Sequence, residues 1–137
     1  MKVNFQNSCE RSNQLDQKIA VIPYSPVAKG LLTRKPSKEQ IETLRFQTDA
    51  VQKRMYNDED LQIAQRVSEV AEARGLPMAQ VALAWMLSKP VVTAPIIGAT
   101  KPHHLDDAAA AVAVQLTPDE IRQLEEAYQP HPVLGYA

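Results

Sequence analysis

The sequence predicts an α/β protein in which helices cover a parallel β-sheet. Its two clearest strand signals, at residues 19–22 and 91–98, are apolar runs rich in β-branched residues. Such runs are typical of strands buried on both faces, as in parallel sheets. Helical patterns lie between the two runs and after the second one. That order favours a parallel sheet covered by helices, although the pattern alone does not separate a barrel from an open sheet.

The N-terminal part of the chain is predicted to be mostly loop. Residues 3–5 alternate apolar and polar side chains and indicate a short strand, whereas the polar segment 7–18 has no clear period. Pro23 closes the strand at 19–22, and a loop follows it. A short helix is expected over residues 38–45, with Pro36 and Ser37 at its start.

Two longer helices are predicted between residue 56 and the second strand signal. Asn57 is a good helix cap, and the acidic side chains that follow it suit the helix dipole. This helix has apolar residues at helical spacing and is expected to end at Arg74 and Gly75. A second helix is expected over residues 78–89, with a core face made of Val81, Ala82, Trp85 and Met86.

Two further helices are predicted after the second strand signal. Thr100 or Lys101 opens the first, which runs into the alanine-rich stretch 108–113. The last helix begins at a capping box in which Thr117 is the cap and Glu120 reaches back. It is expected to run to about Tyr128 and to be followed by an irregular tail.

Composition excludes several classes of protein. The chain has 137 residues, 15 basic against 16 acidic, and 45% hydrophobic residues. These values argue against a disordered chain and against a nucleic-acid-binding domain, which usually has a strongly basic face. The single cysteine, Cys9, excludes an internal disulfide. With no apolar run long enough for a membrane span, the sequence predicts a cytoplasmic protein.

The loop after the second strand signal contains residue types that suit a phosphate group. Ligands of parallel α/β proteins sit at the C-terminal ends of the strands. Gly98 allows close backbone approach, Thr100 can donate a hydrogen bond, and Lys101 adds a cation just before a helix N-terminus. A strand that ends in glycine before a helix is also common without any ligand, so both interpretations remain open.

The loop after the first strand signal has similar candidates. Tyr24 could stack on an aromatic ring such as a nicotinamide, or simply cover the end of a sheet. Lys29, before Gly30, could face a pyrophosphate or be a solvated lysine.

A metal site and a cysteine nucleophile are both disfavoured. His103 and His104 are adjacent in a first helical turn, a spacing that does not suit joint ligation of one metal. Cys9 and His131 could form a nucleophile–base pair only through a long-range contact that nothing in the sequence indicates.

Three stretches, residues 22–32, 71–85 and 95–102, resemble the aldo-keto reductases. They read IPYSPVAKGLL, AEARGLPMAQVALAW and PIIGATKP, and they occur in the family's order. The capping box at residues 117–120 is similar to the start of the family's last helix. The tail at 131–135, HPVLG, resembles a bacterial subgroup associated with 1-deoxyxylulose 5-phosphate and related sugar phosphates.

The resemblance implies an eight-stranded (β/α)8 barrel, the TIM barrel, that reduces aldehydes and ketones with NADPH. It makes residues 1–137 a single C-terminal half of such a barrel, with strands six to eight and their helices. Residues 5–7 would be the end of the sixth strand, residues 19–24 the seventh strand and residues 95–97 the eighth. The connection at 7–18 is shorter and more polar than the family's, and the tail at 129–137 is expected to be irregular.

The resemblance also implies a set of cofactor-binding residues. Gln6 would hold the nicotinamide carboxamide, and Tyr24 would stack on its ring. The pyrophosphate would be lined by Ser25, Val27, Lys29 and Gly30. The adenosine and its 2′-phosphate would be surrounded by Gly98, Thr100, Lys101, His104 and Asp107. Many family members have Arg at the position of His104 and Asn at that of Ala108, so the choice between NADPH and NADH stays open.

No catalytic residue is assigned, because the family's catalytic Asp, Tyr, Lys and His come from earlier strands. The leading hypothesis is therefore a truncated cofactor-binding half of a reductase, inactive alone, that meets a small carbonyl substrate only when completed. The alternative is a non-enzymatic nucleotide-binding regulatory subunit resembling the β-subunits of potassium channels, and the third hypothesis is a degenerate product without function. Exposed strand edges predict self-association.

Overall fold

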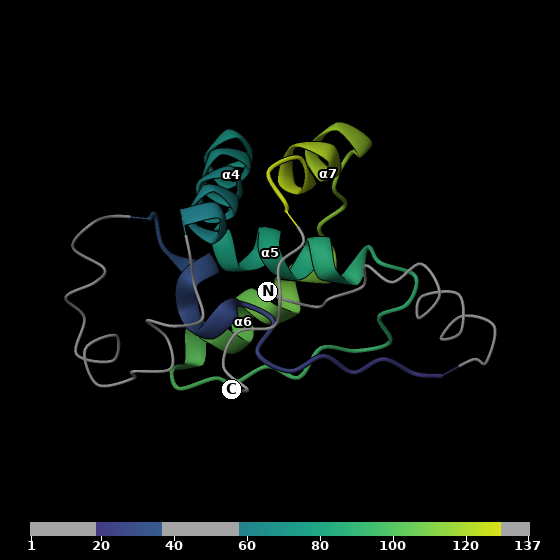
Figure 1. Cartoon of the computed structure of the whole chain (residues 1–137). Coiled ribbons are helices and arrows are strands. Elements are labelled where there is room, and N and C mark those ends of the chain that lie inside the picture. Colours follow the sequence, from purple (N-terminus) through teal and green to yellow (C-terminus); the bar gives the residue numbers. More distant parts are fainter. Residues whose placement is uncertain (1–18, 37–57, 130–137) are drawn as a thin grey trace, which may run out of the picture.

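Helices dominate the part of the chain that the structure, a computed structural model, describes, residues 19–36 and 58–129 (Figure 1). The elements are the 3₁₀ helix η1 (Ala28–Thr33) and the α-helices α4 (Asp58–Arg74), α5 (Met78–Leu87), α6 (Pro102–Ala111) and α7 (Pro118–Glu125). The four helices predicted after residue 56 are therefore confirmed. The strand predicted at 3–5, the loop at 7–18 and the helix at 38–45 lie outside the described residues.

The C-terminus of α4 follows the signal in the sequence. Gly75 has a φ of 61°, a left-handed conformation that glycine adopts readily. The Gly75 N–H donates to the Glu72 carbonyl at 3.2 Å, and the Leu76 N–H donates to the Ala71 carbonyl at 2.9 Å. These two bonds form a Schellman motif. Leu76 also packs against the core, so the motif directs the chain from α4 into α5.

The capping box at the start of α7 is present as predicted. The Glu120 N–H donates to Thr117 Oγ1 at 3.3 Å, and the Thr117 N–H donates to Glu120 Oε2 at 2.7 Å. Helix α7 ends at Glu125, slightly before the predicted Tyr128. Helices α5 and α6 likewise end about two residues before their predicted limits.

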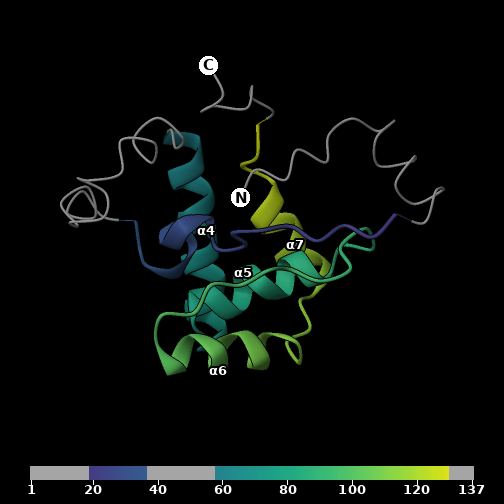
Figure 2. The same cartoon turned by 90° about the horizontal axis from the view of Figure 1, so that it is seen from below.

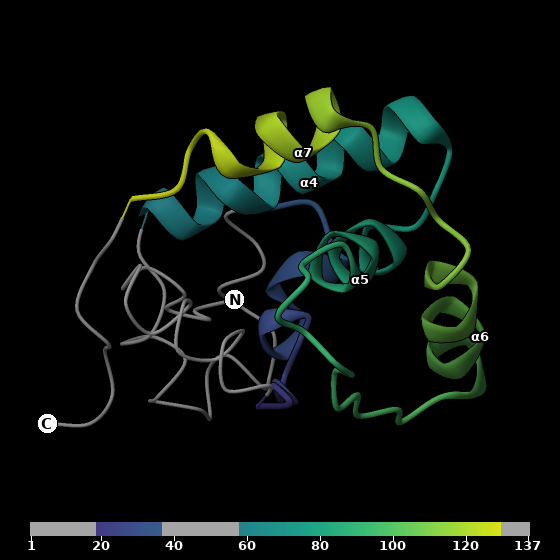
Figure 3. The same ribbon diagram turned by 90° about the vertical axis from the view of Figure 1, so that its right-hand side faces the viewer.

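Helix α5 lies at the centre of the helical assembly. Helices α4 and α7 run side by side across it, and α6 packs on its other side (Figures 1 and 3). Because α5 is covered from several directions, residues on most of its circumference are buried, including Val81, Leu83 and Met86. A helix that is apolar nearly all round is expected in such a position.

The core is formed mainly between α4, α5, α7 and η1. Trp85 is partly buried against it, and Met86 is completely buried. Leu61, the first of the apolar residues at helical spacing in α4, is 40% exposed and lies outside this core. The buried residues of this cluster are Ala28, Leu32, Ala64, Val67, Val70, Ala71, Met78, Val81, Ala82 and Leu124.

Charged side chains join the helices around this core. Arg74, at the end of α4, donates to both carboxylate oxygens of Glu120 at 3.1 Å. Glu125 on α7 accepts a hydrogen bond from the Trp85 indole at 2.9 Å and pairs with Lys89. The first arrangement connects α7 to α4, and the second connects α7 to α5 and to the turn that follows it.

Two extended segments, residues 19–24 and 91–97, run parallel to each other beside the helices (Figure 2). Val21 bridges to Val92 and Tyr24 bridges to Ile96. The Thr93 N–H donates to the Val21 carbonyl at 2.9 Å, and the Ile96 N–H donates to the Pro23 carbonyl at 2.8 Å. The predicted parallel pairing of these segments is present.

The predicted burial of these segments is wrong, and so is their assignment as regular strands. Within the described residues each contains isolated bridges and no continuous strand. Ile22 is 55% exposed, Tyr24 72% and Ile96 56%. These three side chains share one face, because Ile22 and Tyr24 are two residues apart and Tyr24 lies opposite Ile96. We call it the apolar face. A two-stranded sheet is only marginally stable by itself. Its side chains are buried only where a neighbouring layer of helices or strands covers them.

The capping box gives a direct test of the fold. Replacing Thr117 with Ala removes the acceptor for the Glu120 N–H, and we expect a loss of about 1 kcal/mol in the free energy of unfolding. Thr117→Ser keeps the hydroxyl and should lose much less. Urea denaturation of both variants measures the difference. Equal losses would show that the hydroxyl does not cap α7.

Glu120 also predicts a dependence of stability on pH. Its pKa lies below the ordinary value of 4.5, chiefly because the Thr117 N–H donates to the carboxylate, with a further contribution from Arg74. A carboxyl group whose pKa is lowered on folding stabilises the folded state above its unfolded-state pKa. This stabilisation is lost as pH falls through the folded-state pKa.

The matched variant is Glu120→Gln, which keeps a capping side chain and removes the charge. We expect the wild type to be more stable than this variant above about pH 5, where an unfolded glutamate is largely ionised. The difference should shrink as pH falls below 4.5. Thermal unfolding across this range measures it. A difference that stays constant with pH would contradict the role of the charge.

Candidate cofactor site

Two loops leave the paired segments at the same end. The first loop, residues 24–30, follows the bridge at Tyr24, and the second loop, residues 98–101, follows the bridge at Ile96. Both lead away on the left side of Figure 2, the first through residues 28–30, which begin η1, and the second into α6. Because the segments are parallel, their carboxyl ends place the loops together. This is the end where parallel α/β proteins bind ligands.

The first loop has an unusual backbone. Ser25 has a φ of 56°, Ala28 of 50° and Lys29 of 54°, and Gly30 has a φ of 101°. Left-handed conformations are unfavourable for residues other than glycine. Such conformations persist only where the surroundings hold them, and they gather at functional sites. The backbone of the first loop therefore marks it as a candidate binding loop.

Hydrogen bonds and burial hold the first loop in this shape. The Ser25 carbonyl accepts from the Ala28 N–H at 3.0 Å, and the Ser25 hydroxyl oxygen accepts from the Lys29 N–H at 3.3 Å. The Gly30 carbonyl accepts from the Thr33 hydroxyl at 2.9 Å. Ala28 is buried in the core while Lys29 remains exposed. The loop is thus anchored on one side and accessible on the other.

The second loop is exposed and ends at the N-terminus of α6. Lys101 has an extended backbone and is the N-cap residue, with Pro102 in the first turn. The Thr100 N–H donates to His104 Nδ1 at 3.3 Å. Nδ1 acts as the acceptor in this bond, which leaves Nε2 as the ring nitrogen that can donate. The loop therefore offers an ammonium group and an imidazole donor.

Asp107 lies one turn beyond His104 and is held by α5. The Gln80 amide donates to Asp107 Oδ1 at 2.9 Å, and both side chains are partly buried. Residues three apart share one face of a helix, so His104 and Asp107 point to the same side of α6. Sequence reasoning missed Gln80, because no local pattern indicates a contact between residues 27 positions apart.

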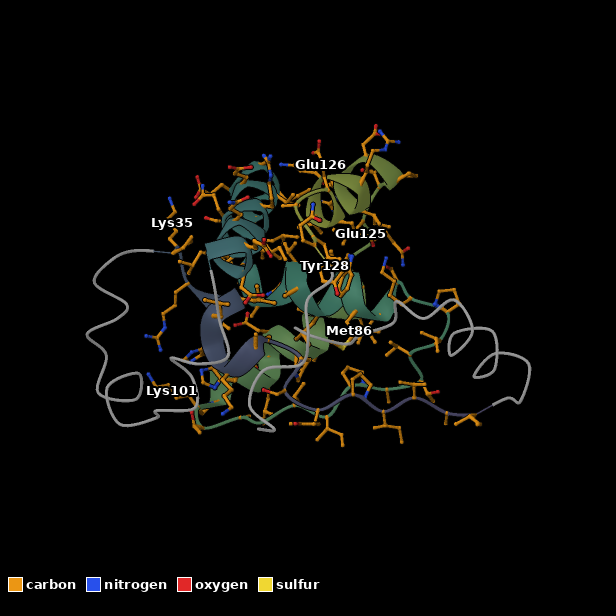
Figure 4. All side chains as sticks on the ribbon, viewed as in Figure 1. Lys35, Met86, Lys101, Glu125, Glu126 and Tyr128 are labelled. Carbon is orange, nitrogen blue, oxygen red and sulfur yellow. The ribbon has the colours of Figure 1, made fainter. Side chains whose placement is uncertain are left out.

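The site residues predicted from the sequence are placed as follows. The first loop carries Tyr24, Ser25, Val27, Lys29 and Gly30, the second loop carries Gly98, Thr100 and Lys101, and α6 carries His104 and Asp107. Val27 is partly buried against the core, and the Tyr24 ring is exposed. Lys101 is exposed and lies far from Glu125 in Figure 4. Gln6 lies outside the described residues.

The charge of the two loops suits an anion. Lys29 and Lys101 are present, whereas residues 24–30 and 98–101 contain no carboxylate. A hollow of about 450 Å³ against α7 has the opposite character, since it is lined by Asp119, Arg122, Gln123, Glu125 and Glu126. The two loops are therefore the better place for a phosphate-bearing ligand.

Neither a metal cluster nor a membrane span is found in the part of the chain that the structure describes. In residues 19–36 and 58–129, no three His, Cys, Asp or Glu side chains gather closely enough to hold a metal ion. Among the helices described, none is both long and apolar enough to cross a bilayer.

Comparison with known proteins identifies the family. The model of the aldo/keto reductase family matches residues 9–129, so the chain belongs to this family. Membership implies the (β/α)8 barrel fold. The versiconal hemiacetal acetate reductase of Aspergillus parasiticus is 42% identical over an alignment of 138 residues. This alignment covers 93% of this chain and 39% of that protein.

Two further fungal relatives are similar. An aldo-keto reductase of Fusarium vanettenii is 38% identical, covering 89% of this chain and 33% of its own length. An aldo-keto reductase of Metarhizium robertsii is 39% identical, covering 87% of this chain and 32% of its own length. The chain thus spans about a third of the length of these relatives. All three are named as reductases, and none supports the alternative of a regulatory subunit.

The strained backbone of the first loop is testable by a pair of glycine substitutions. At Gly30 a Cβ would lie 3.7 Å from Thr33 Oγ1, so Gly30→Ala has room but keeps an unfavourable φ. We expect it to lower the free energy of unfolding by about 1–2 kcal/mol. Gly98→Ala, where nothing lies within 4 Å, should have little effect. Equal stability of the two variants in urea denaturation would argue against the left-handed backbone.

Proposed function

We propose that this chain forms the cofactor-binding part of an NADPH-dependent reductase that converts carbonyl groups to alcohols. In this proposal it supplies strands six to eight of a (β/α)8 barrel with their helices. The observation that carries the proposal is the position of two loops at one end of the paired segments, with cations and no carboxylate. The relatives that are named as reductases support the same function.

The residues present fit the parts of the cofactor. The exposed Tyr24 ring offers a flat surface on which the nicotinamide can stack, and Gln6 would hold the carboxamide. Lys29 and the backbone of the first loop would neutralise the pyrophosphate. The 2′-phosphate would bind Lys101 and the Nε2–H of His104, because charge-assisted bonds to phosphate are the strong ones.

The bound nicotinamide would supply the hydride. The residues of this chain bind and orient the cofactor in this proposal, and the forming alkoxide still needs a proton donor. We assign that donor to the part of the barrel that the longer relatives contain and this chain does not span. The chain alone is therefore expected to bind NADPH without turnover. We expect it to do so in the cytoplasm.

The apolar face bears on the same proposal. In a complete barrel, side chains from the other strands fill the interior and would cover such a face. In this chain by itself we expect a second copy or a rearranged segment to cover the exposed strand edge, so self-association remains part of the proposal. A carbonyl substrate would bind only after completion of the barrel.

Calorimetric titration with NADPH and NADH tests the proposal. We expect saturable binding of one NADPH per chain. Lys101→Ala should weaken NADPH binding by about 10-fold, the equivalent of one charge-assisted hydrogen bond, and change NADH binding little. Arg122→Ala is the matched control, because Arg122 is an exposed cation on α7 paired with Asp119.

Two results would count against this function. Absence of binding to either nucleotide, in a chain shown to be folded by circular dichroism, would mean that the loops bind no dinucleotide. Equal losses for NADPH and NADH in Lys101→Ala would remove Lys101 from the 2′-phosphate site.

A further inference from the structure

We propose that Glu125 is a positioning residue for the cofactor site: through Lys89 it holds the segment at 91–97 in register with residues 19–24. The second loop, residues 98–101, then depends on α7, although α7 contributes no residue to either loop. The effect on the cofactor rests on the proposed function. The effect on the register of the two segments does not, and it is tested without nucleotide.

Three side chains, Trp85, Lys89 and Glu125, meet between α5 and α7, and we call them the junction cluster. Glu125 Oε1 accepts a hydrogen bond from the Trp85 indole at 2.9 Å and pairs with the Lys89 ammonium group. Lys89 Nζ also lies 4.8 Å from the centre of the Trp85 ring, within the range of a cation–π contact. Glu125 is thus directed from α7 toward α5 (Figure 4), and Lys89 is held by two partners.

The junction cluster is better shielded from water than another ion pair of the same helix. The Lys89 side chain is 22% exposed and the Glu125 side chain 43%. In the pair of Arg122 with Asp119, the exposed fractions are 74% and 84%. Water and salt weaken such exposed pairs, many of which contribute nothing measurable. The pair of Lys89 with Glu125 therefore keeps more of its strength.

The backbone of Lys89 connects the junction cluster to the second segment. Lys89 lies two residues after the end of α5. Its N–H donates to the Met86 carbonyl at 3.1 Å, and its carbonyl accepts from the Val92 N–H at 2.9 Å. Val92 in turn bridges to Val21. A Lys89 side chain held by Glu125 therefore fixes the turn from which the second segment starts.

The pairing of the two segments needs such support because it is short. Within the described residues it consists of the bridges at Val21 and Tyr24, and two paired strands are only marginally stable by themselves. The register decides where the second loop emerges relative to the first. A ligand that contacts both loops binds only the molecules whose register is correct, so its apparent Kd rises as their fraction falls. Loss of the pair of Lys89 with Glu125 lowers that fraction.

Amide hydrogen exchange measures the register directly. The Thr93 N–H donates to the Val21 carbonyl and the Ile96 N–H donates to the Pro23 carbonyl, so both amides are protected while the segments are paired. In Glu125→Gln the side-chain carbonyl still accepts from the Trp85 indole, but the charge is lost. We expect the Thr93 and Ile96 amides of this variant to exchange about 3–5-fold faster, the effect of one partly exposed ion pair.

Asp119→Asn is the matched control. It removes the same charge from α7, in the exposed pair with Arg122, and should leave both amides unchanged. Lys89→Met removes the cation but keeps an apolar stem against Trp85, and it should reproduce the effect of Glu125→Gln. It also replaces that variant if Glu125→Gln fails to fold. The double variant should show no further acceleration, because both changes remove the same pair.

A purely structural role for Glu125 is the competing explanation. In that case the loss of the charge would weaken the packing of α7 and make global unfolding more frequent. The Val70 amide, inside α4 and buried, would then accelerate as much as the Thr93 and Ile96 amides or more. In our proposal the Thr93 and Ile96 amides accelerate more than the Val70 amide. Exchange relative to Val70 therefore separates the two roles.

Calorimetric titration of the same variants measures the effect on the cofactor. Glu125→Gln should raise the Kd for NADPH by the same factor of about 3–5, whereas Asp119→Asn should not. If the Thr93 and Ile96 amides accelerate no more than Val70, the inference is overturned. Faster exchange with an unchanged Kd would overturn its cofactor part. Absence of nucleotide binding by the folded wild type would overturn the proposed function, while the exchange data would still decide the role of Glu125 in the register.

Discussion

The parallel pairing of residues 19–24 with residues 91–97 is the constraint on which the candidate site depends. Two backbone hydrogen bonds, from Thr93 to Val21 and from Ile96 to Pro23, fix the relative direction of the segments. Antiparallel pairing would send the two loops to opposite ends. Because the segments are parallel, the strained first loop and the cationic second loop emerge at the same end.

The helices support this arrangement from one side. Helix α5 contacts η1, which continues the first loop, and α6, which continues the second loop. The buried surface of α5 therefore connects the core to both loops. On the other side the apolar face is uncovered in the described residues, which suits a part of a larger barrel or a chain that associates with itself.

The sequence predicts the helices well because their signals are local. The glycine after Arg74 and the capping box at Thr117 act through neighbouring residues, and both are present where expected. The burial of Ile22 and Ile96 was predicted wrongly, because burial depends on layers that a short segment does not specify. The hydrogen bond between Gln80 and Asp107 was missed for a related reason, since it arises from the packing of α5 on α6. The family resemblance indicated the two loops, and the left-handed residues of the first loop became visible only in the structure.

The central claim is that the two loops form one binding site, and nuclear magnetic resonance tests it most directly. Amide signals of a labelled chain would be followed as NADPH is added. The account predicts that residues 24–30 and residues 98–101 shift together and report a single Kd, while the exposed surface of α7 around Arg122 stays unchanged. Shifts confined to one loop, or two different Kd values for the two loops, would contradict it.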